Sequence, residues 1–243
     1  MLVTGTGAAL HARPLVYDAP PDAVALSAEK RLVLARVGAA GRVLEIGAHT
    51  GTFSAALRAS GCAVTAVEAD PRAAALAAPR AERLLVGSIE DAAVQARLGG
   101  PYDVVLCMHV LEHLVDPWAV LRALRGRVGA GGRLLALLPN VGCWRVRKAL
   151  FLQGRFEYEE TGILDRTHLR FFTLASARQL VRSSGWSEVT LTPVDVCVPL
   201  ARRLGRLPIA GRLAGRWERL LASRLPNLCT EIVLIEARAQ GRA

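Results

Sequence analysis

Five short apolar segments alternate with helical stretches between residues 42 and 139, and this rhythm constrains the fold more than any other feature of the sequence. The apolar segments are RVLEIG (42–47), AVTAVEA (63–69), RLLVGS (83–88), YDVVLCM (102–108) and RLLALLP (133–139). The intervening stretches, roughly 52–60, 71–78, 90–98 and 117–128, have helical composition. Buried apolar strands that alternate with helices indicate βαβ units and a parallel sheet. Right-handed crossovers make such a sheet doubly wound.

The rhythm changes on both sides of this core. Residues 1–41 read as an irregular segment followed by a helix from about Ser27 to Val37. After Pro139 come a basic helical stretch (Cys143–Leu152), a polar loop, and a helix that Thr173 would cap and Gly185 would end. Two further strands, SEVTLTPVDV and TEIVLIEARA, are separated by about 30 residues without an obvious crossover, which allows antiparallel pairing.

The length of 243 residues and the apolar content of 52% suit one sizeable core, so a single domain is the expectation. We divide it into three parts. These are the N-terminal segment and helix (1–41), a cofactor-binding core (42–139), and a C-terminal part (140–243) that carries an acceptor-side loop, helices, the last two strands and a basic insertion at about 198–228.

Much of the net charge of +10 is concentrated in one segment. Between Ala201 and Arg224 there are seven arginines and one acid, Glu218, which leaves +6. Leu213, Trp217 and Leu220 fall at helical spacing there, so the first interpretation is a helix whose apolar face docks on the fold or on a second subunit. Peripheral contact of 201–224 with an anionic membrane is the second. Nucleic acid is disfavoured, because only 5% of the residues are aromatic.

The cysteine pattern bears on the compartment. The five cysteines are far apart and form no CxxC, which favours a reduced cytoplasmic setting over a disulfide framework or a zinc site. We find no run of 18 apolar residues and no signal-like start. The expected localisation is therefore cytoplasmic, with contact at the inner membrane face as the variant that the basic segment suggests.

The ends of the first three strands carry residues suited to a nucleotide-like ligand. In an open α/β sheet a ligand lies beyond the carboxyl ends of the strands. The first strand leads into a glycine loop that opens a helix, whose N-terminus favours an anion. The second ends in VEAD, where an acid can accept hydrogen bonds from both ribose hydroxyls. The third ends in VGSIED, which places two polar residues near a base. In chain order these residues are Glu45, Gly47, Gly51, Glu68, Ser88 and Glu90.

The loop reads E-x-G-x-x-x-G and not the G-x-G-x-x-G of dinucleotide-binding folds. Together with VEAD and YDVVLCMHVLEHLVDP, it resembles the class I S-adenosylmethionine-dependent methyltransferases over roughly residues 40–140. The resemblance implies a doubly wound, Rossmann-like, mostly parallel seven-stranded sheet with the last strand antiparallel and helices on both faces. It implies S-adenosyl-L-methionine as the cofactor. The residues that would contact it are Glu45, Gly47, Ala48, Gly51, Glu68, Ala69, Ser88, Ile89, Met108 and His109.

Two positions depart from the family pattern. His49 replaces the middle glycine of the loop, and Ser88 stands where relatives often carry an acid. We expect His49 to adopt a backbone conformation open to non-glycine residues, with its side chain directed away from the ligand or toward the methionine carboxylate.

His109-Val110-Leu111-Glu112-His113 spells H-x-x-E-H, the inverted zinc-peptidase signature. A helix could present both histidines to a zinc ion. Here the motif directly follows a strand, and Asp116-Pro117 ends it soon afterwards, so we expect too little helix to hold the ligands and no metal. The same pattern is routine in the methyltransferases that the chain resembles.

The segment Thr161–Thr173 concentrates an acid, two arginines and a histidine. One interpretation is a solvated loop with an arginine salt bridge. The segment also resembles a subgroup of these enzymes, the type 11/12/23 methyltransferase families, which often accompany glycosyltransferases in cell-surface polysaccharide or glycolipid pathways. That resemblance implies that Asp165, Arg166, His168 and Arg170 form or brace an acceptor pocket, which Trp144 would help to keep dry.

The expected activity is in-line O-methylation of a sugar or lipid-linked saccharide. His168 or His109 would act as the base, and Asp165 would orient an imidazole. The alternative acceptor is a small aromatic, quinone or natural-product hydroxyl. An RNA methyltransferase, a basic nucleic-acid-binding module and a catalytically silent scaffold are the less favoured hypotheses. The acceptor, the methylated atom and the oligomeric state are not fixed by these patterns.

Overall fold

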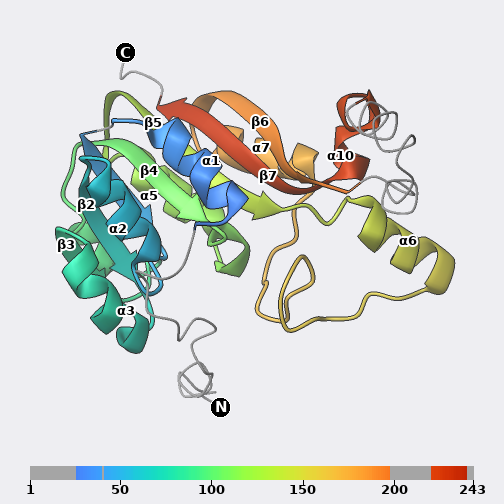
Figure 1. Cartoon of the computed structure of the whole chain (residues 1–243), viewed down its shortest axis with the longest axis horizontal. Coiled ribbons are helices and arrows are strands. Elements are labelled where there is room, and N and C mark those ends of the chain that lie inside the picture. The colour runs from blue at the N-terminus through green and yellow to red at the C-terminus, as the bar shows by residue number, and fades with distance from the viewer. Residues whose placement is uncertain (1–25, 40, 198–219, 240–243) are drawn as a thin grey trace.

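The computed structural model describes residues 26–39, 41–197 and 220–239, and its seven described strands form one sheet (Figure 1). The order across the sheet is β3-β2-β1-β4-β5-β7-β6. The strands are β1 (Arg42–Ile46), β2 (Ala63–Glu68), β3 (Arg83–Val86), β4 (Tyr102–Met108), β5 (Val128–Pro139), β6 (Trp186–Val196) and β7 (Thr230–Ala239).

The strand directions confirm the predicted architecture. Neighbouring strands from β3 to β5 pair in parallel, whereas β7 is antiparallel to both β5 and β6. The order reverses between β1 and β4, which makes their carboxyl ends the topological switch point where ligands of such sheets bind. The fold is therefore the Rossmann-like arrangement that the sequence indicates.

Helices cover both faces of the sheet (Figure 1). The helices α1 (Ala28–Val37), α2 (Thr52–Ala59) and α3 (Pro71–Ala77) pack on one face, and α4 (Ala92–Ala96), α5 (Pro117–Arg125) and α7 (Leu174–Ser183) on the other. Alternate residues of β4 serve the two cores: Val104 and Leu106 face α1 and α2, while Val105 and Cys107 face α5 and α7. Burial on both faces explains why the strands read as continuous apolar runs.

The remaining described elements are short or peripheral. They are the 3-10 turns η3 (Ala78–Arg80) and η4 (Leu111–His113), and the helices α6 (Trp144–Gln153) and α10 (Pro226–Cys229). Helix α6 and the loop that follows it, residues 154–172, extend from one end of the sheet (Figure 1).

Side-chain caps fix two helix starts that the sequence indicates. Ser27 accepts a hydrogen bond from the Lys30 amide at 3.3 Å and begins α1. At α7, Thr173 Oγ1 accepts from the Ser176 amide at 3.2 Å, and Ser176 Oγ accepts from the Thr173 amide at 2.9 Å. This reciprocal capping box satisfies two amides that the helix itself leaves without partners.

The bounds of four predicted elements differ from the structure. Strand β5 begins at Val128, before the expected 133, because the glycine-rich stretch VGAGG is extended and pairs Val128 with Tyr102. The preceding helix accordingly ends at Arg125. The helix expected over 90–98 is confined to Ala92–Ala96, and β3 ends at Val86.

The expectations for the basic segment fall mainly on residues 198–219, which lie outside the described residues. Residues 220–224, its last part, are helical. None of the five cysteines, all within the described part of the chain, forms a disulfide. Among the described helices, none is long and apolar enough to cross a membrane.

Thr173→Ala should destabilise the protein by about 1 kcal/mol, because it removes one half of the capping box at α7. Urea denaturation followed by circular dichroism measures this as a lower midpoint with an unchanged slope. The exposed Thr161 provides the control, since Thr161→Ala removes the same atoms from the loop surface. Equal midpoints for the two variants would contradict the capping role.

Candidate active site

The loop after β1 depends on two glycines with positive φ, Gly47 at 74° and Gly51 at 78°. A Cβ on Gly47 would lie 2.6 Å from Cγ2 of Val110, and a Cβ on Gly51 would lie 2.8 Å from Cα of Ala77. Conformation and space therefore both require glycine at these positions. Gly47 thus packs against the turn after β4, and Gly51 packs against α3. These contacts within the protein require glycine in addition to the expected approach of a ligand.

His49 adopts a left-handed conformation with φ 50°. Non-glycine residues occupy this region uncommonly, but histidine is among the more frequent ones, so the substitution of the middle glycine is tolerated as expected. Burial lowers the pKa of the imidazole and keeps it neutral. The backbone amide of His49 donates to Glu68 Oε2 at 2.6 Å, which ties the loop to the end of β2.

Glu68 is 9% exposed and accepts two backbone hydrogen bonds, since the Asp70 amide also donates, to Oε1, at 2.9 Å. A carboxylate oxygen can accept a second hydrogen bond, so each oxygen retains capacity for a ligand hydroxyl. The two amides hold the carboxylate in one orientation at the carboxyl edge of the sheet. This geometry fits the predicted contact with ribose hydroxyls, and Ala69 beside it is exposed.

Glu45 lies beneath the loop and is only 2% exposed. Burial raises the pKa of its carboxyl to about 7, against the lowering effects of the Ser54 hydroxyl, which donates to it from α2, and of the Lys30 ammonium. Glu45 is thus close to half ionised at neutral pH. A cationic group at the predicted methionine end would favour the ionised form.

The predicted base-binding residues at the end of β3 divide into two groups. Ile89 is buried, and the Ser88 hydroxyl accepts from the Glu90 amide at 3.2 Å. The carboxylate of Glu90 accepts from the amides of Val115 and Asp116, at 3.2 and 2.8 Å. Glu90 therefore braces the loop after β4, a role that the sequence pattern does not show.

The end of β4 presents the half-buried Met108 and His109 to the switch point. His109 Nδ1 lies 3.4 Å from Glu112 Oε1, and Nε2 lies 3.5 Å from Glu29 Oε2. Burial alone would lower the pKa of His109, but the carboxylates of Glu112 and Glu29, which face its two ring nitrogens, raise it to about 9. The imidazole is then a cation at neutral pH. The contacts suit a wall of the cofactor pocket and oppose the expectation that His109 is the base.

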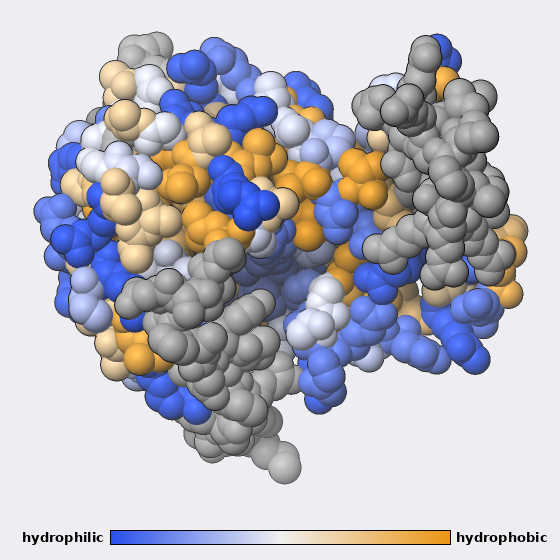
Figure 2. All heavy atoms as spheres, viewed as in Figure 1, coloured by the Kyte–Doolittle hydropathy of each residue, from blue (hydrophilic) through white to orange (hydrophobic). Residues whose placement is uncertain are grey.

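The motif H-x-x-E-H does not form the helix that a zinc peptidase needs. Leu111–His113 make a single 3-10 turn, as its position between a strand and Asp116-Pro117 predicts. The loop 154–172 docks on this turn, because the amides of Leu169 and Arg170 donate to the carbonyl oxygen of Glu112 at 2.8 and 3.0 Å. Figure 2 shows a recess between the body of the sheet and this loop, and the residues visible in the recess are hydrophilic.

His168 is brought beside His113, with the ring centroids 4.8 Å apart. Its Nδ1 lies 3.0 Å from the Ile163 carbonyl oxygen, and burial lowers the pKa of the imidazole. A carbonyl oxygen only accepts, so Nδ1 carries the proton and Nε2 has the lone pair. His168 is therefore a neutral group on the acceptor side.

Asp165 does not orient this imidazole. Burial would raise the pKa of Asp165, but the hydroxyl and amide of Thr167, which both donate to Oδ1, lower it on balance. The carbonyl oxygen of Ile163 orients His168 instead. The expected catalytic role of Asp165 is replaced by a role in shaping the loop.

The arginines of the loop contact the protein itself. Arg166 pairs with Glu160, as the salt-bridge interpretation predicts. Arg170 donates from Nε to the Val115 carbonyl oxygen at 3.2 Å and lies 5.8 Å from the ring centre of Trp118. Arg170 therefore braces the loop against the segment after β4, and Trp144 begins α6 at a half-buried position.

Three site residues were not singled out as functional from the sequence. Glu29 and Lys30 reach the site from the first turn of α1, which no motif marks. Glu112 is fully buried between the two histidines of its motif and His168. The H-x-x-E-H motif is the one sequence pattern that points to Glu112. The motif does not show that Glu112 is buried, because its burial depends on the distant loop.

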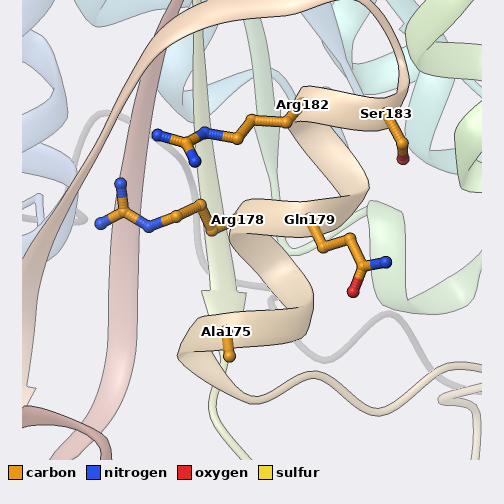
Figure 3. Close-up of a pocket in the computed structure, with 5 residues that line it drawn as sticks. All are labelled: Ala175, Arg178, Gln179, Arg182 and Ser183. Carbon is orange, nitrogen blue, oxygen red and sulfur yellow. The ribbon is translucent and has the colours of Figure 1, made fainter.

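A separate hollow of about 520 Å³ lies on the surface of α7. Figure 3 shows Arg178 and Arg182 extending together from the helix, with Gln179 and Ser183 on another side. This hollow is lined by α7 alone and includes none of the predicted site residues.

The comparison with protein families gives one match that spans most of the chain. A family model described as a methyltransferase domain matches residues 22–191. Among curated proteins, the ubiquinone biosynthesis O-methyltransferase of Xanthomonas axonopodis pv. citri is 37% identical over 117 residues, which are 44% of this chain and 47% of that protein. The chain thus spans about half the length of the curated relatives that it matches.

Solved structures share the fold at low identity. A SAM-dependent methyltransferase from Archaeoglobus fulgidus has a TM-score of 0.61 and 16% identity, over 86% of this chain and 94% of that one. Phosphoethanolamine N-methyltransferase 2 of Haemonchus contortus, in complex with S-adenosyl-L-methionine, has a TM-score of 0.55 and 12% identity, over 88% of this chain and 52% of that one. These similarities concern the fold alone.

Glu68→Gln should weaken binding of S-adenosyl-L-methionine at least tenfold, since a charged hydrogen bond to a hydroxyl contributes about 1.5–3 kcal/mol. Isothermal titration calorimetry measures the change. The exposed Glu82 provides the matched control: Glu82→Gln should bind like the unmodified chain. An unchanged affinity in a folded Glu68→Gln protein would refute the ribose assignment.

Glu45→Gln should flatten the pH dependence of stability in the cofactor-free protein. The raised pKa means that the stabilisation is present below pH 4.5 and is lost as the pH rises through about 7. The full loss corresponds to about 3 kcal/mol. Urea denaturation at pH 5 and pH 8 should therefore show a smaller decrease for Glu45→Gln than for the unmodified chain. Parallel decreases in the two proteins would show that Glu45 does not titrate in this range.

Proposed function

Because the chain belongs to the methyltransferase-domain family, we propose that it transfers a methyl group to a hydroxyl of a small aromatic or quinone-type molecule. The family and the fold make it an S-adenosyl-L-methionine-dependent methyltransferase. The observation that carries the acceptor class is its similarity to ubiquinone biosynthesis O-methyltransferases. The similarity supports the aromatic or quinone alternative better than the saccharide that the loop segment suggested.

Contacts within the loop 154–172 support the same acceptor class. The ring of Phe171 lies 5.6 Å from Phe156 and 6.2 Å from both Tyr158 and His168. Such a cluster suits contact with a flat ring. The saccharide interpretation relied on a basic rim, but Arg166 and Arg170 bind Glu160 and the Val115 carbonyl oxygen.

The chain's main contribution to the reaction is alignment. The sulfonium of the cofactor is already activated, and holding acceptor oxygen, methyl carbon and sulfur in line contributes roughly 7–11 kcal/mol. In this proposal Glu68 fixes the ribose, the loop from Gly47 to Gly51 holds the methionine end, and Met108 lies on the acceptor side. The loop 154–172 supplies the wall opposite the cofactor.

The proton of the acceptor hydroxyl must leave as the methyl group arrives. His168 is neutral, and its Nε2 lone pair is the available acceptor on this side of the site. That lone pair can take the proton directly, or it can hold a group that makes the hydroxyl more acidic. The buried carboxylate of Glu112, which lies beside His168 and has no hydrogen-bond partner among the described residues, favours the second role.

Incubation of the purified chain with S-adenosyl-L-methionine and either a catechol or a set of free sugars tests the acceptor class. We expect S-adenosylhomocysteine to accumulate with the catechol, and mass spectrometry to find one added methyl group on oxygen. The Glu68→Gln variant serves as the control for cofactor dependence. Methylation of a sugar with no product from the catechol would overturn the proposal.

A further inference from the structure

Three side chains from two distant segments converge next to the end of β4. Glu112 and His113 come from η4, and His168 comes from the docked loop. One ligand atom from each of the three lies within 4.8 Å of the others. Two backbone hydrogen bonds to the Glu112 carbonyl oxygen hold the segments together. The cluster is therefore built by the fold and is not a chance meeting of flexible surface groups.

The carboxylate of Glu112 indicates that something is bound here. Its residue is 0% exposed, and neither carboxylate oxygen has a hydrogen-bond partner among the described residues. A buried carboxylate without partners is costly, because it has lost water and gained no donor. His109 approaches one oxygen at 3.4 Å without completing a hydrogen bond. A cation that binds the carboxylate would remove this cost.

The two imidazoles already have a tautomer that suits metal ligands. Nδ1 of His113 lies 3.2 Å from the Thr167 carbonyl oxygen, and Nδ1 of His168 lies 3.0 Å from that of Ile163. Each carbonyl oxygen accepts the Nδ1 proton, so each Nε2 keeps its lone pair. Metal-bound histidines are commonly fixed by this kind of outer hydrogen bond, which sets the tautomer and the ring orientation.

We propose that Glu112, His113 and His168 bind a divalent transition-metal ion. Two imidazole nitrogens and one carboxylate oxygen suit ions such as Zn²⁺, Fe²⁺ or Mn²⁺ better than Ca²⁺, which prefers oxygen ligands alone. Three protein ligands leave positions for water or an acceptor. The ligand set differs from that of the peptidase motif, because His168 takes the place of His109.

His109 then has a defined relation to the site. Its Nε2 faces Glu29 at 3.5 Å, so it links the carboxylate cluster to the first turn of α1. In the absence of the ion, the imidazolium balances part of the charge of Glu112. The ion would take over this balance, and His109 would remain in the wall between the ion and the cofactor edge.

The role of the ion in catalysis rests on the proposed function. An acceptor hydroxyl bound to the ion ionises more readily, and its proton passes to solvent. The acceptor oxygen then forms its bond to the methyl carbon while the carbon–sulfur bond breaks. The sulfur keeps that electron pair and leaves as a neutral thioether. In this scheme His168 holds the ion instead of taking the proton.

Titration of the tag-free, chelator-treated chain with Zn²⁺ alone tests the site without any acceptor. Calorimetry should show saturable binding of one ion per chain. Glu112→Gln and His168→Gln should each weaken it at least tenfold. His49→Asn removes an imidazole outside the cluster and tolerates the left-handed backbone, so it should bind Zn²⁺ like the unmodified chain.

Melting temperatures, measured with and without Zn²⁺, show whether a variant that binds no metal is still folded. Without metal, Glu112→Gln should melt at the same or a higher temperature than the unmodified chain, because it removes a buried carboxylate whose oxygens have no hydrogen-bond partner among the described residues. Zn²⁺ should raise the melting temperature of the unmodified chain and leave that of Glu112→Gln unchanged. His113→Gln provides a second ligand variant with the same expectation for the metal response. Absence of saturable binding, or equal binding by the ligand variants, would overturn the site.

Turnover separates this inference from the proposed function. Metal binding that depends on Glu112, without methylation of a catechol, would leave the site standing and refute the acceptor class. Methylation of a catechol by chelated, metal-free protein would support the acceptor class and refute the catalytic role of the ion. Loss of turnover on chelation, with recovery when the ion is added back, supports both.

Discussion

Two backbone amides, those of Leu169 and Arg170, converge on the carbonyl oxygen of Glu112, and the acceptor side of the site depends on this contact. These hydrogen bonds connect the long loop after α6 to the short turn after β4. The Nδ1 of His113 at the Thr167 carbonyl oxygen and the Arg170 guanidinium at the Val115 carbonyl oxygen join the same two segments. The sheet positions the cofactor edge by its own topology, whereas the opposite wall is held by these contacts between segments that are distant in sequence.

The cofactor edge is held together in a comparable manner. Glu68 accepts amides from the loop after β1 and from the start of α3, so a single carboxylate joins the ends of two strands. The left-handed backbone of His49 directs its amide at that carboxylate. The middle residue of the glycine loop therefore contributes its backbone amide, and not its side chain, to the contact with Glu68. This explains how a histidine can stand where relatives carry glycine, provided that its backbone reaches positive φ.

Local periodicity predicts the alternation of strands and helices, and the family resemblance implies the seven-stranded sheet with its last strand antiparallel, which the structure confirms. Ser27 and Thr173 mark helix starts by local chemistry, and both are confirmed. The differences involve contacts that the sequence pattern does not show. Glu90 follows a strand, and its carboxylate accepts from the distant amides of Val115 and Asp116. The pattern pairs Asp165 with an imidazole, but the hydroxyl and amide of Thr167, two residues along the chain, donate to its carboxylate. Strand β5 was shortened because glycines read as a turn.

The electrostatics of the site are consistent with the chemistry of a cationic methyl donor. Glu45, Glu68 and Glu112 are all nearly or fully buried at one edge of the sheet, and the described cations that offset them are Lys30 and His109. Burial of several carboxylates opposes folding unless cations arrive with the ligands. A sulfonium cofactor brings one positive charge near Glu45 and Glu68, and a divalent ion would bring more to Glu112. The site is thus expected to be more stable when loaded than when empty, so that binding and local order are coupled.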